Sequence, residues 1–253
     1  MLLTDVAKVA EAAKNKAELC NNHFGKYFMR AVMAGFYIVV ATILSNVSAA
    51  VLYSTYPQFG KLLGAFLFSL AIVLVVFLNG ELFTGNNFVM AVGVYNKTVS
   101  VKDMVKVWVV SYVGNFVGAI LLSAMFVYSK ASHAIMVDYY NSFIYTKISA
   151  GLPELLLKGI LCNFLVCMAV LVGTKLKSES GKLIIMFCII MSFVVAGFEH
   201  CIANMSTFSI GYMLLGNIGT ASVIKSMIVV TIGNILGGAV LLGVPVQVMK
   251  AEH

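Results

Sequence analysis

Three ionisable side chains interrupt long apolar stretches of the sequence: Glu81, Glu199 and His200. If these stretches span a membrane, each charge costs at least about 2.5 kcal/mol unless it is compensated. Each glutamate is followed five residues later by an asparagine, Asn86 and Asn204. We interpret the glutamates as structural anchors that cap the free N–H groups of a following half-helix. The competing interpretation is that they relay protons.

His200 is the only one of the four histidines that lies in an apolar stretch. No second histidine or paired cysteine lies at metal-ligand spacing, so the sequence predicts no metal site. A lone histidine in an apolar stretch is more often a core residue, but the corresponding segment around Glu81 offers Thr84. We therefore favour a pore-facing role, because an imidazole can donate a hydrogen bond or a proton near neutral pH and a threonine can donate or accept.

The composition places these groups in a membrane protein. Of the 253 residues, 61% are hydrophobic and 11% are charged, against about 25% charged residues in a soluble domain. Such a chain cannot build a polar shell, which disfavours soluble enzymes, nucleic-acid-binding proteins and secreted disulfide modules. The net charge of +7 comes from lysines and arginines between apolar segments, a signal of membrane topology. The five cysteines form no CxxC pair and are interpreted as small buried hydrophobes.

Six segments are apolar enough to be membrane spans, namely 31–52, 62–78, 104–126, 155–172, 183–195 and 224–244. The second and fifth run into the polar segments 79–86 and 196–204, and each is then followed by a further short apolar piece. We therefore predict that these two spans are broken helices. Residues 1–26 have an amphipathic helical pattern without the apolar core of a signal peptide, so we expect no cleavage there.

The two halves of the chain repeat one another. The motif Gly114-Asn115-x-x-Gly118 recurs as Gly233-Asn234-x-x-Gly237, at a similar distance after each glutamate. Because each repeat holds three spans, the second copy must enter the membrane inverted, an arrangement that points to a transport pathway near the bilayer midplane. The sequence thus predicts one all-α channel domain, 1–253, with inverted repeats at 27–126 and 155–246. The motif glycines are interpreted as helix-packing residues.

Charge and motif counts narrow the function. Twelve lysines and arginines fall on the side of the termini and five on the other side, which predicts cytoplasmic termini. The predicted pathway carries no ring of carboxylates, which disfavours a cation channel. No nucleotide-binding or hydrolase motif is present, and we find no second catalytic group at membrane depth, so we expect no enzyme. Apolar side chains near the two breaks should form constrictions that exclude hydrated ions: Phe68, Leu82, Phe83, Phe193 and Phe198.

The segments Asn79-Gly-Glu-Leu-Phe-Thr-Gly-Asn86 and Gly197-Phe-Glu-His-Cys-Ile-Ala-Asn-Met205 resemble the formate/nitrite transporter family. The resemblance covers nearly the whole chain. It implies a homopentamer with one aquaporin-like pore per protomer, no cofactor, and passage of small monovalent anions or their conjugate acids. The chain looks closest to the bacterial hydrosulfide-channel branch. That likeness implies a multi-pass protein of the bacterial inner membrane for hydrosulfide, with formate and nitrite as alternative substrates. A neutral-solute pore is the alternative function, although the twin Asn-Pro-Ala boxes of aquaporins are absent.

The resemblance also implies roles by position. His200 becomes the central pore histidine, faced by Thr84 and with Asn163 close by. Lys147 would lie in the outer vestibule, and Asn204 would hold the second break in shape. The resemblance divides the constrictions into a cytoplasmic one, formed by Leu82, Phe83 and Val166, and an outer one, formed by Phe68 and Phe193. A channel and a proton-coupled transporter would share these residues.

Overall fold

A computed structural model describes residues 3–216 and 218–250, and every element in these two ranges is helical. The first half contains α1 (Leu3–Asn22), α2 (Phe24–Leu52), α3 (Pro57–Phe68), α4 (Leu70–Phe77), α5 (Phe83–Tyr95) and α6 (Val101–Tyr128). After α7 (His133–Ser149), the second half contains α8 (Leu152–Lys175), α9 (Glu179–Val195), α10 (Cys201–Leu215), α11 (Thr220–Ile235), the π-helix η1 (Leu236–Leu242) and α12 (Gly243–Val248).

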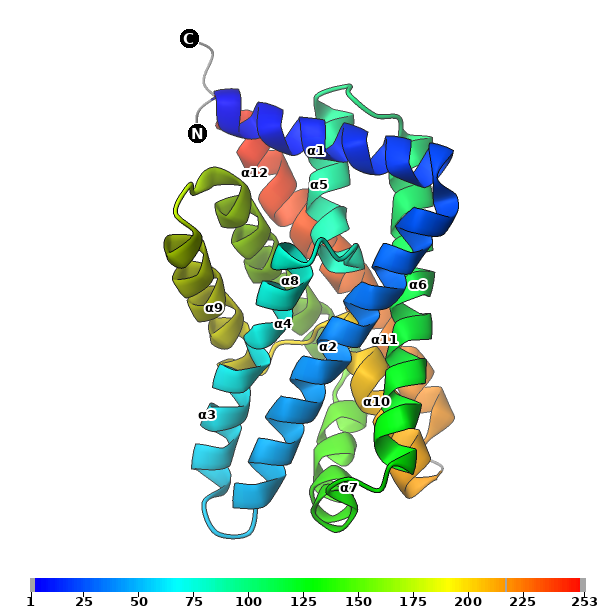
Figure 1. The fold of residues 1–253 in the computed structure, drawn as a ribbon. Coiled ribbons are helices and arrows are strands. Elements are labelled where there is room, and N and C mark those ends of the chain that lie inside the picture. The colour runs from blue at the N-terminus through cyan, green and yellow to red at the C-terminus, as the bar shows by residue number, and fades with distance from the viewer. Residues whose placement is uncertain (1–2, 217, 251–253) are drawn as a thin grey trace.

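The long helices run side by side, α1 lies across one end of the bundle and α7 lies at the other (Figure 1). We call these the α1 end and the α7 end. By length and composition, five helical segments within the described ranges could cross a membrane: Phe24–Leu52, Pro57–Phe77, Val101–Tyr128, Leu152–Lys175 and Thr220–Val248. The all-helical architecture with several apolar helices agrees with the sequence analysis. The predicted fifth span corresponds to α9, which has 17 residues.

Glycines let the helix pairs α2/α6 and α8/α11 approach to backbone contact. A Cβ added at Gly118 of α6 would overlap the Val32 carbonyl of α2. In the second half, a Cβ added at Gly237 of η1 would overlap the Ile160 carbonyl of α8. Only a residue without a side chain fits such crossings. The packing role that the sequence suggested for these glycines therefore has a direct geometric reason.

Two short non-helical loops lie in the interior of the bundle. The first, residues 78–82, joins α4 to α5, and the second, residues 196–200, joins α9 to α10. Both turn by a residue with positive φ, Asn79 at 53° and Gly197 at 75°. Both also close with the same type of backbone bond, from Gly80 N–H to the Val75 carbonyl and from Phe198 N–H to the Phe193 carbonyl. The two polar segments of the sequence therefore form equivalent loops.

The sequence analysis did not predict helix α7. It left residues 127–154 outside both predicted repeats. The helix is held by three fully or almost fully buried side chains, Met136, Tyr140 and Ile144, spaced four residues apart on one face. Such a stripe stabilises a helix by packing even where the opposite face is polar. The face packs mainly against α10, α2 and α11.

Candidate functional site

One buried asparagine side chain organises the first loop. Asn115 Oδ1 accepts a hydrogen bond from Phe83 N–H at 2.9 Å, which caps the start of α5. Its Nδ2 donates to the Glu81 carbonyl of the loop at 3.0 Å and to the Ala31 carbonyl of α2 at 2.8 Å. A single amide thus joins α2, α6 and the loop: it satisfies the Phe83 N–H and the Glu81 carbonyl, and adds a bond to the Ala31 carbonyl within α2.

Asn234 performs the same task in the second loop. Its Oδ1 accepts from Cys201 N–H at 2.9 Å, and its Nδ2 donates to the carbonyls of Glu199 at 3.0 Å and Gly159 at 2.8 Å. Both asparagines are fully buried. Sequence reasoning had found them inside the repeated glycine motif but gave them no role. The available signal was an amide conserved between the two copies of an otherwise apolar span.

The two glutamates do not cap the half-helices, contrary to our expectation. Glu81 instead accepts from Lys16 Nζ of α1 at 2.6 Å and from Asn86 Nδ2 at 3.2 Å. Each carboxylate is thereby neutralised by a lysine, because a buried charge without a partner costs several kcal/mol. The capping that we assigned to them is performed by the amides of Asn115 and Asn234, each of which offers a donor and an acceptor, and at α10 also by His200 Nδ1.

The second glutamate repeats this arrangement with a lysine from the opposite end of the bundle. Glu199 accepts from Lys147 Nζ of α7 at 2.7 Å and from Asn204 Nδ2 at 2.8 Å, and Lys147 also donates to Asn204 Oδ1 at 3.0 Å. The side chains of Glu81 and Glu199 are only 6% and 8% exposed. We call the two groups the lysine–glutamate–asparagine clusters. One contains Lys16, Glu81 and Asn86, and the other contains Lys147, Glu199 and Asn204.

The two halves of the chain meet where His200 Nε2, at the end of the second loop, lies 2.9 Å from Thr84 Oγ1 in the first turn of α5. His200 Nδ1 accepts a hydrogen bond from Ala203 N–H at 3.1 Å, so this nitrogen carries no proton. In a neutral imidazole the proton then resides on Nε2, which donates to Thr84. The threonine hydroxyl keeps its own hydrogen for another acceptor. Both side chains are buried.

The side chain of Asn163 in α8 stabilises the surroundings of this contact through hydrogen bonds. Its Nδ2 lies 3.1 Å from the Thr84 carbonyl, 3.1 Å from Asn87 Oδ1 and 2.6 Å from the Asn234 carbonyl. The side chain is fully buried. It contacts the backbone of Thr84 and not its hydroxyl, so it positions the first loop against the second half of the chain.

Apolar side chains surround a very small space next to His200. The space measures about 10 Å³, and its walls include four of the five residues that the resemblance assigned to the constrictions: Phe68, Leu82, Val166 and Phe193. The rings of Phe68 and Phe193 meet edge to face with centroids 6.1 Å apart. The fifth residue, Phe83, packs its ring against Tyr112 at 4.9 Å. On this scale about 10–15 Å³ holds one water, so the space beside His200 has room for about one water between mostly apolar walls.

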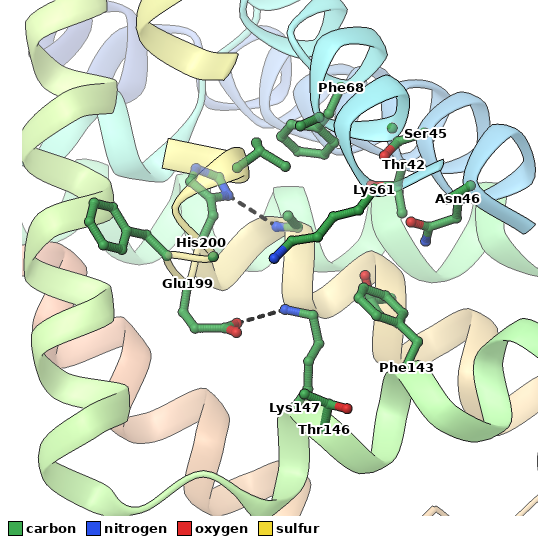
Figure 2. Close-up of a pocket in the computed structure, with 18 of the residues that line it drawn as sticks. Thr42, Ser45, Asn46, Lys61, Phe68, Phe143, Thr146, Lys147, Glu199 and His200 are labelled. Atoms are coloured by element: carbon green, nitrogen blue, oxygen red, sulfur yellow. Dashed lines mark hydrogen bonds and ion pairs between the residues drawn. The ribbon is translucent and has the colours of Figure 1, made fainter. Parts of the chain in front are cut away.

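A much larger pocket opens from the α7 end and reaches His200. Its volume is about 520 Å³, and its lining includes the Lys147–Glu199 pair. Figure 2 shows Lys61 and Lys147 directing their ammonium groups into the same space, with Thr42 and Ser45 on its far wall. The pocket therefore offers positive charge and hydroxyl groups up to the entrance of the apolar constriction. Among the residues that the structure describes, no three His, Cys, Asp or Glu side chains form a metal-ion site.

Comparison with known proteins connects this geometry to transport. The family model for "Formate/nitrite transporter" matches residues 4–248. The nitrite transporter NirC of Salmonella typhimurium is 29% identical over 252 residues, which cover 96% of this chain and 90% of NirC. A solved "FNT family ion channel" superposes with a TM-score of 0.91 at 26% identity, covering 98% of this chain and 99% of the other. A "Pentameric formate channel with formate bound" gives a TM-score of 0.75 at 28% identity, covering 88% and 96%.

The asparagine amides make the first testable prediction. Replacing Asn115 by Leu leaves the buried Phe83 N–H and the Glu81 carbonyl without their partner, and each such group costs about 1–3 kcal/mol. We expect Asn115→Leu to lower the thermal unfolding temperature sharply. Asn21→Ala is the control, because Asn21 also bonds between helices, to Asp103 and Lys106, but at the exposed surface. Equal melting temperatures for both variants would contradict the role assigned to Asn115.

Proposed function

The chain belongs to the formate/nitrite transporter family, and from this premise we propose that it conducts small monovalent anions, or their conjugate acids, along the path from the α7-end pocket past His200. The observation that carries the proposal is the contact of His200 with Thr84 at 2.9 Å, directly beside an apolar space of about 10 Å³. A solute that enters this space loses its water. Among the residues that line the space, His200 is the polar one, and together with Thr84 it offers hydrogen bonds that can replace the lost water.

Charge explains why the solute is an anion. The pocket at the α7 end is lined by Lys61, Lys147 and Lys158, against one lining carboxylate, Glu199. Positive groups in a cleft with apolar walls raise the local anion concentration. At the other end of the path, the Lys16–Glu81 pair lies at an equivalent place beside the first loop. An anion therefore meets a lysine on each side of the apolar constriction.

The tautomer of His200 determines which ring nitrogen can donate a hydrogen bond during the passage of a solute. Because Ala203 N–H occupies Nδ1, a second ring proton would have to displace that backbone bond. In this conformation the imidazole therefore acts through Nε2–H and Thr84, and the threonine hydroxyl donates to the passing solute. Transfer of a proton to the solute would require a new proton to reach the histidine. The arrangement favours hydrogen-bonded passage and leaves a proton-coupled cycle as the alternative.

We propose that the chain is a single transmembrane domain of two inverted repeats, with α3–α4–α5 and α9–α10 as the broken second and fifth spans. The matched bonds of Asn115 and Asn234 support this pairing. The excess of lysine and arginine at the α1 end supports cytoplasmic termini, and we place the protein in the bacterial inner membrane. The pentameric state of a similar formate channel supports a homopentamer.

The relatives are named as transporters and channels, which supports transport and not catalysis. Their names indicate formate and nitrite, and we propose these as substrates. Hydrosulfide, the anion that the sequence suggested first, remains our proposal for the physiological solute on the likeness to that branch. A neutral-solute pore is the competing function, and the lysine-lined approach argues against it.

The function can be tested in proteoliposomes with a panel of solutes. We expect formate, nitrite and hydrosulfide to enter much faster than into protein-free liposomes, while water flux stays at the level of those liposomes. Varying the pH gradient separates channel conduction from proton coupling. Rapid water flux without anion flux would establish the neutral-solute pore instead.

Variants at the central contact test its mechanism. Thr84→Val removes the hydroxyl with little change of shape, and we expect about a tenfold loss of anion flux, the size of one hydrogen bond of about 1.4 kcal/mol. His200→Phe should impair or alter flux and its pH dependence while the oligomer stays intact. His200→Asn is the matched variant, because it can still cap Ala203 N–H. Wild-type flux and pH dependence in both histidine variants would exclude a central role.

The constriction makes a separate prediction. Phe193→Leu should raise flux and weaken discrimination between formate and a bulkier carboxylate, at little cost in stability, because the lost atoms faced the passage. Phe88→Leu is the control, since Phe88 is a fully buried core residue. That variant should lose about 1–2 kcal/mol of stability and keep its selectivity. A melting temperature lowered as far in Phe193→Leu, with unchanged relative fluxes, would place Phe193 in the core.

A further inference from the structure

The pocket at the α7 end is far larger than the proposed substrates need. It measures about 520 Å³, whereas the space beyond the Phe68–Phe193 contact measures about 10 Å³. Since about 10–15 Å³ on this scale holds one water, the pocket has room for a molecule of many atoms and the passage does not. A solute can therefore bind in the pocket and yet be too broad to go further.

The pocket also carries one positive charge that has no ion-pair partner among the described residues. Lys147 is paired with Glu199 at 2.7 Å, and Lys158 is paired with Glu154 at 2.6 Å. Lys61 of α3 also lines the pocket, and within the described ranges it forms no ion pair and no side-chain hydrogen bond. Its ammonium group points into the pocket beside Lys147 (Figure 2). The charge of the site thus matches a ligand with a single negative charge.

One wall of the pocket is aromatic. Tyr53 packs edge to face on Tyr139 with centroids 5.5 Å apart, and Tyr139 stacks on Phe143 at 5.1 Å. All three side chains line the pocket. Rings of this kind bind a further flat apolar group by stacking or edge contacts, worth about 0.5–1.5 kcal/mol beyond the buried area. Formate, nitrite and hydrosulfide carry no such group, so these small anions do not use the wall.

We propose that this pocket is a binding site for an organic monoanion with an aromatic or similarly broad apolar group, whose anionic group pairs with Lys61 and whose apolar group lies against Tyr53, Tyr139 and Phe143. Because the ligand cannot pass between Phe68 and Phe193, it blocks the path from the α7 end. The blocking rests on the proposed function, whereas the binding does not.

Benzenesulfonate tests the binding, because its charge is permanent near neutral pH. Titration calorimetry of the purified full-length protein in detergent should detect benzenesulfonate, and should detect the neutral benzenesulfonamide only weakly. Lys61→Met keeps most of the side-chain stem, and we expect it to weaken benzenesulfonate binding about fivefold, as for an ion pair at the edge of solvent. Lys130→Met is the matched control, since Lys130 is exposed, carries the same charge and does not line the pocket.

Three results would overturn the binding site: no binding to the wild type, equal binding of the two compounds, or equal weakening by both lysine variants. The block is tested by formate flux in proteoliposomes with benzenesulfonate on both sides. We expect inhibition in the wild type and Lys130→Met, and about fivefold weaker inhibition in Lys61→Met. Binding without inhibition would refute the block alone. If formate flux itself were absent, the proposed function would fail, and calorimetry would still decide the binding site.

Discussion

The structure depends on how backbone groups are satisfied where two helices stop inside an apolar bundle. Each stop leaves N–H and carbonyl groups that lipid and apolar side chains cannot serve, at a cost of several kcal/mol per group. In both halves one asparagine amide of a neighbouring helix supplies the donor and the acceptor together. The loops can then stay irregular, and irregular backbone brings Thr84 and His200 face to face.

The charged side chains at the loops also need partners inside the protein. Glu81 and Glu199 would be expensive as isolated ions, and each receives a lysine from a helix outside the main bundle. Because Lys16 lies on α1 and Lys147 on α7, these two end helices cover the bundle and also supply the lysines that pair with the buried glutamates. Between the clusters the described residues place the polar contact of His200 with Thr84, so under the proposed function an anion would meet hydrogen-bonding groups there and no fixed counter-ion that would trap it.

The sequence predicted the parts of this design that local patterns encode. Hydropathy located the long helices, and the repeated polar segments located both loops and singled out His200 and Thr84. It missed α7, since a stripe of three buried side chains is invisible to hydropathy. It also assigned capping to the wrong groups. Lys16 and Glu81 are 65 residues apart, and the partner of a carboxylate over such a distance is set by tertiary packing. The same holds for Phe83, whose ring direction follows from its contact with Tyr112.

The clusters also divide cleanly along the chain, which matters for biosynthesis. Lys16, Glu81, Asn86 and Asn115 all precede α7, and Lys147, Glu199, Asn204 and Asn234 all lie in α7 or after it, which we count together here as the second half. In each half the lysine is translated before its glutamate, so the carboxylate emerges from the ribosome when its counter-ion already exists. Chains are made from the N-terminus at about 5–20 residues per second. Lys16 and Glu81 therefore have several seconds to pair while the second half is synthesised. Each half thus carries within itself what its insertion into a bilayer requires.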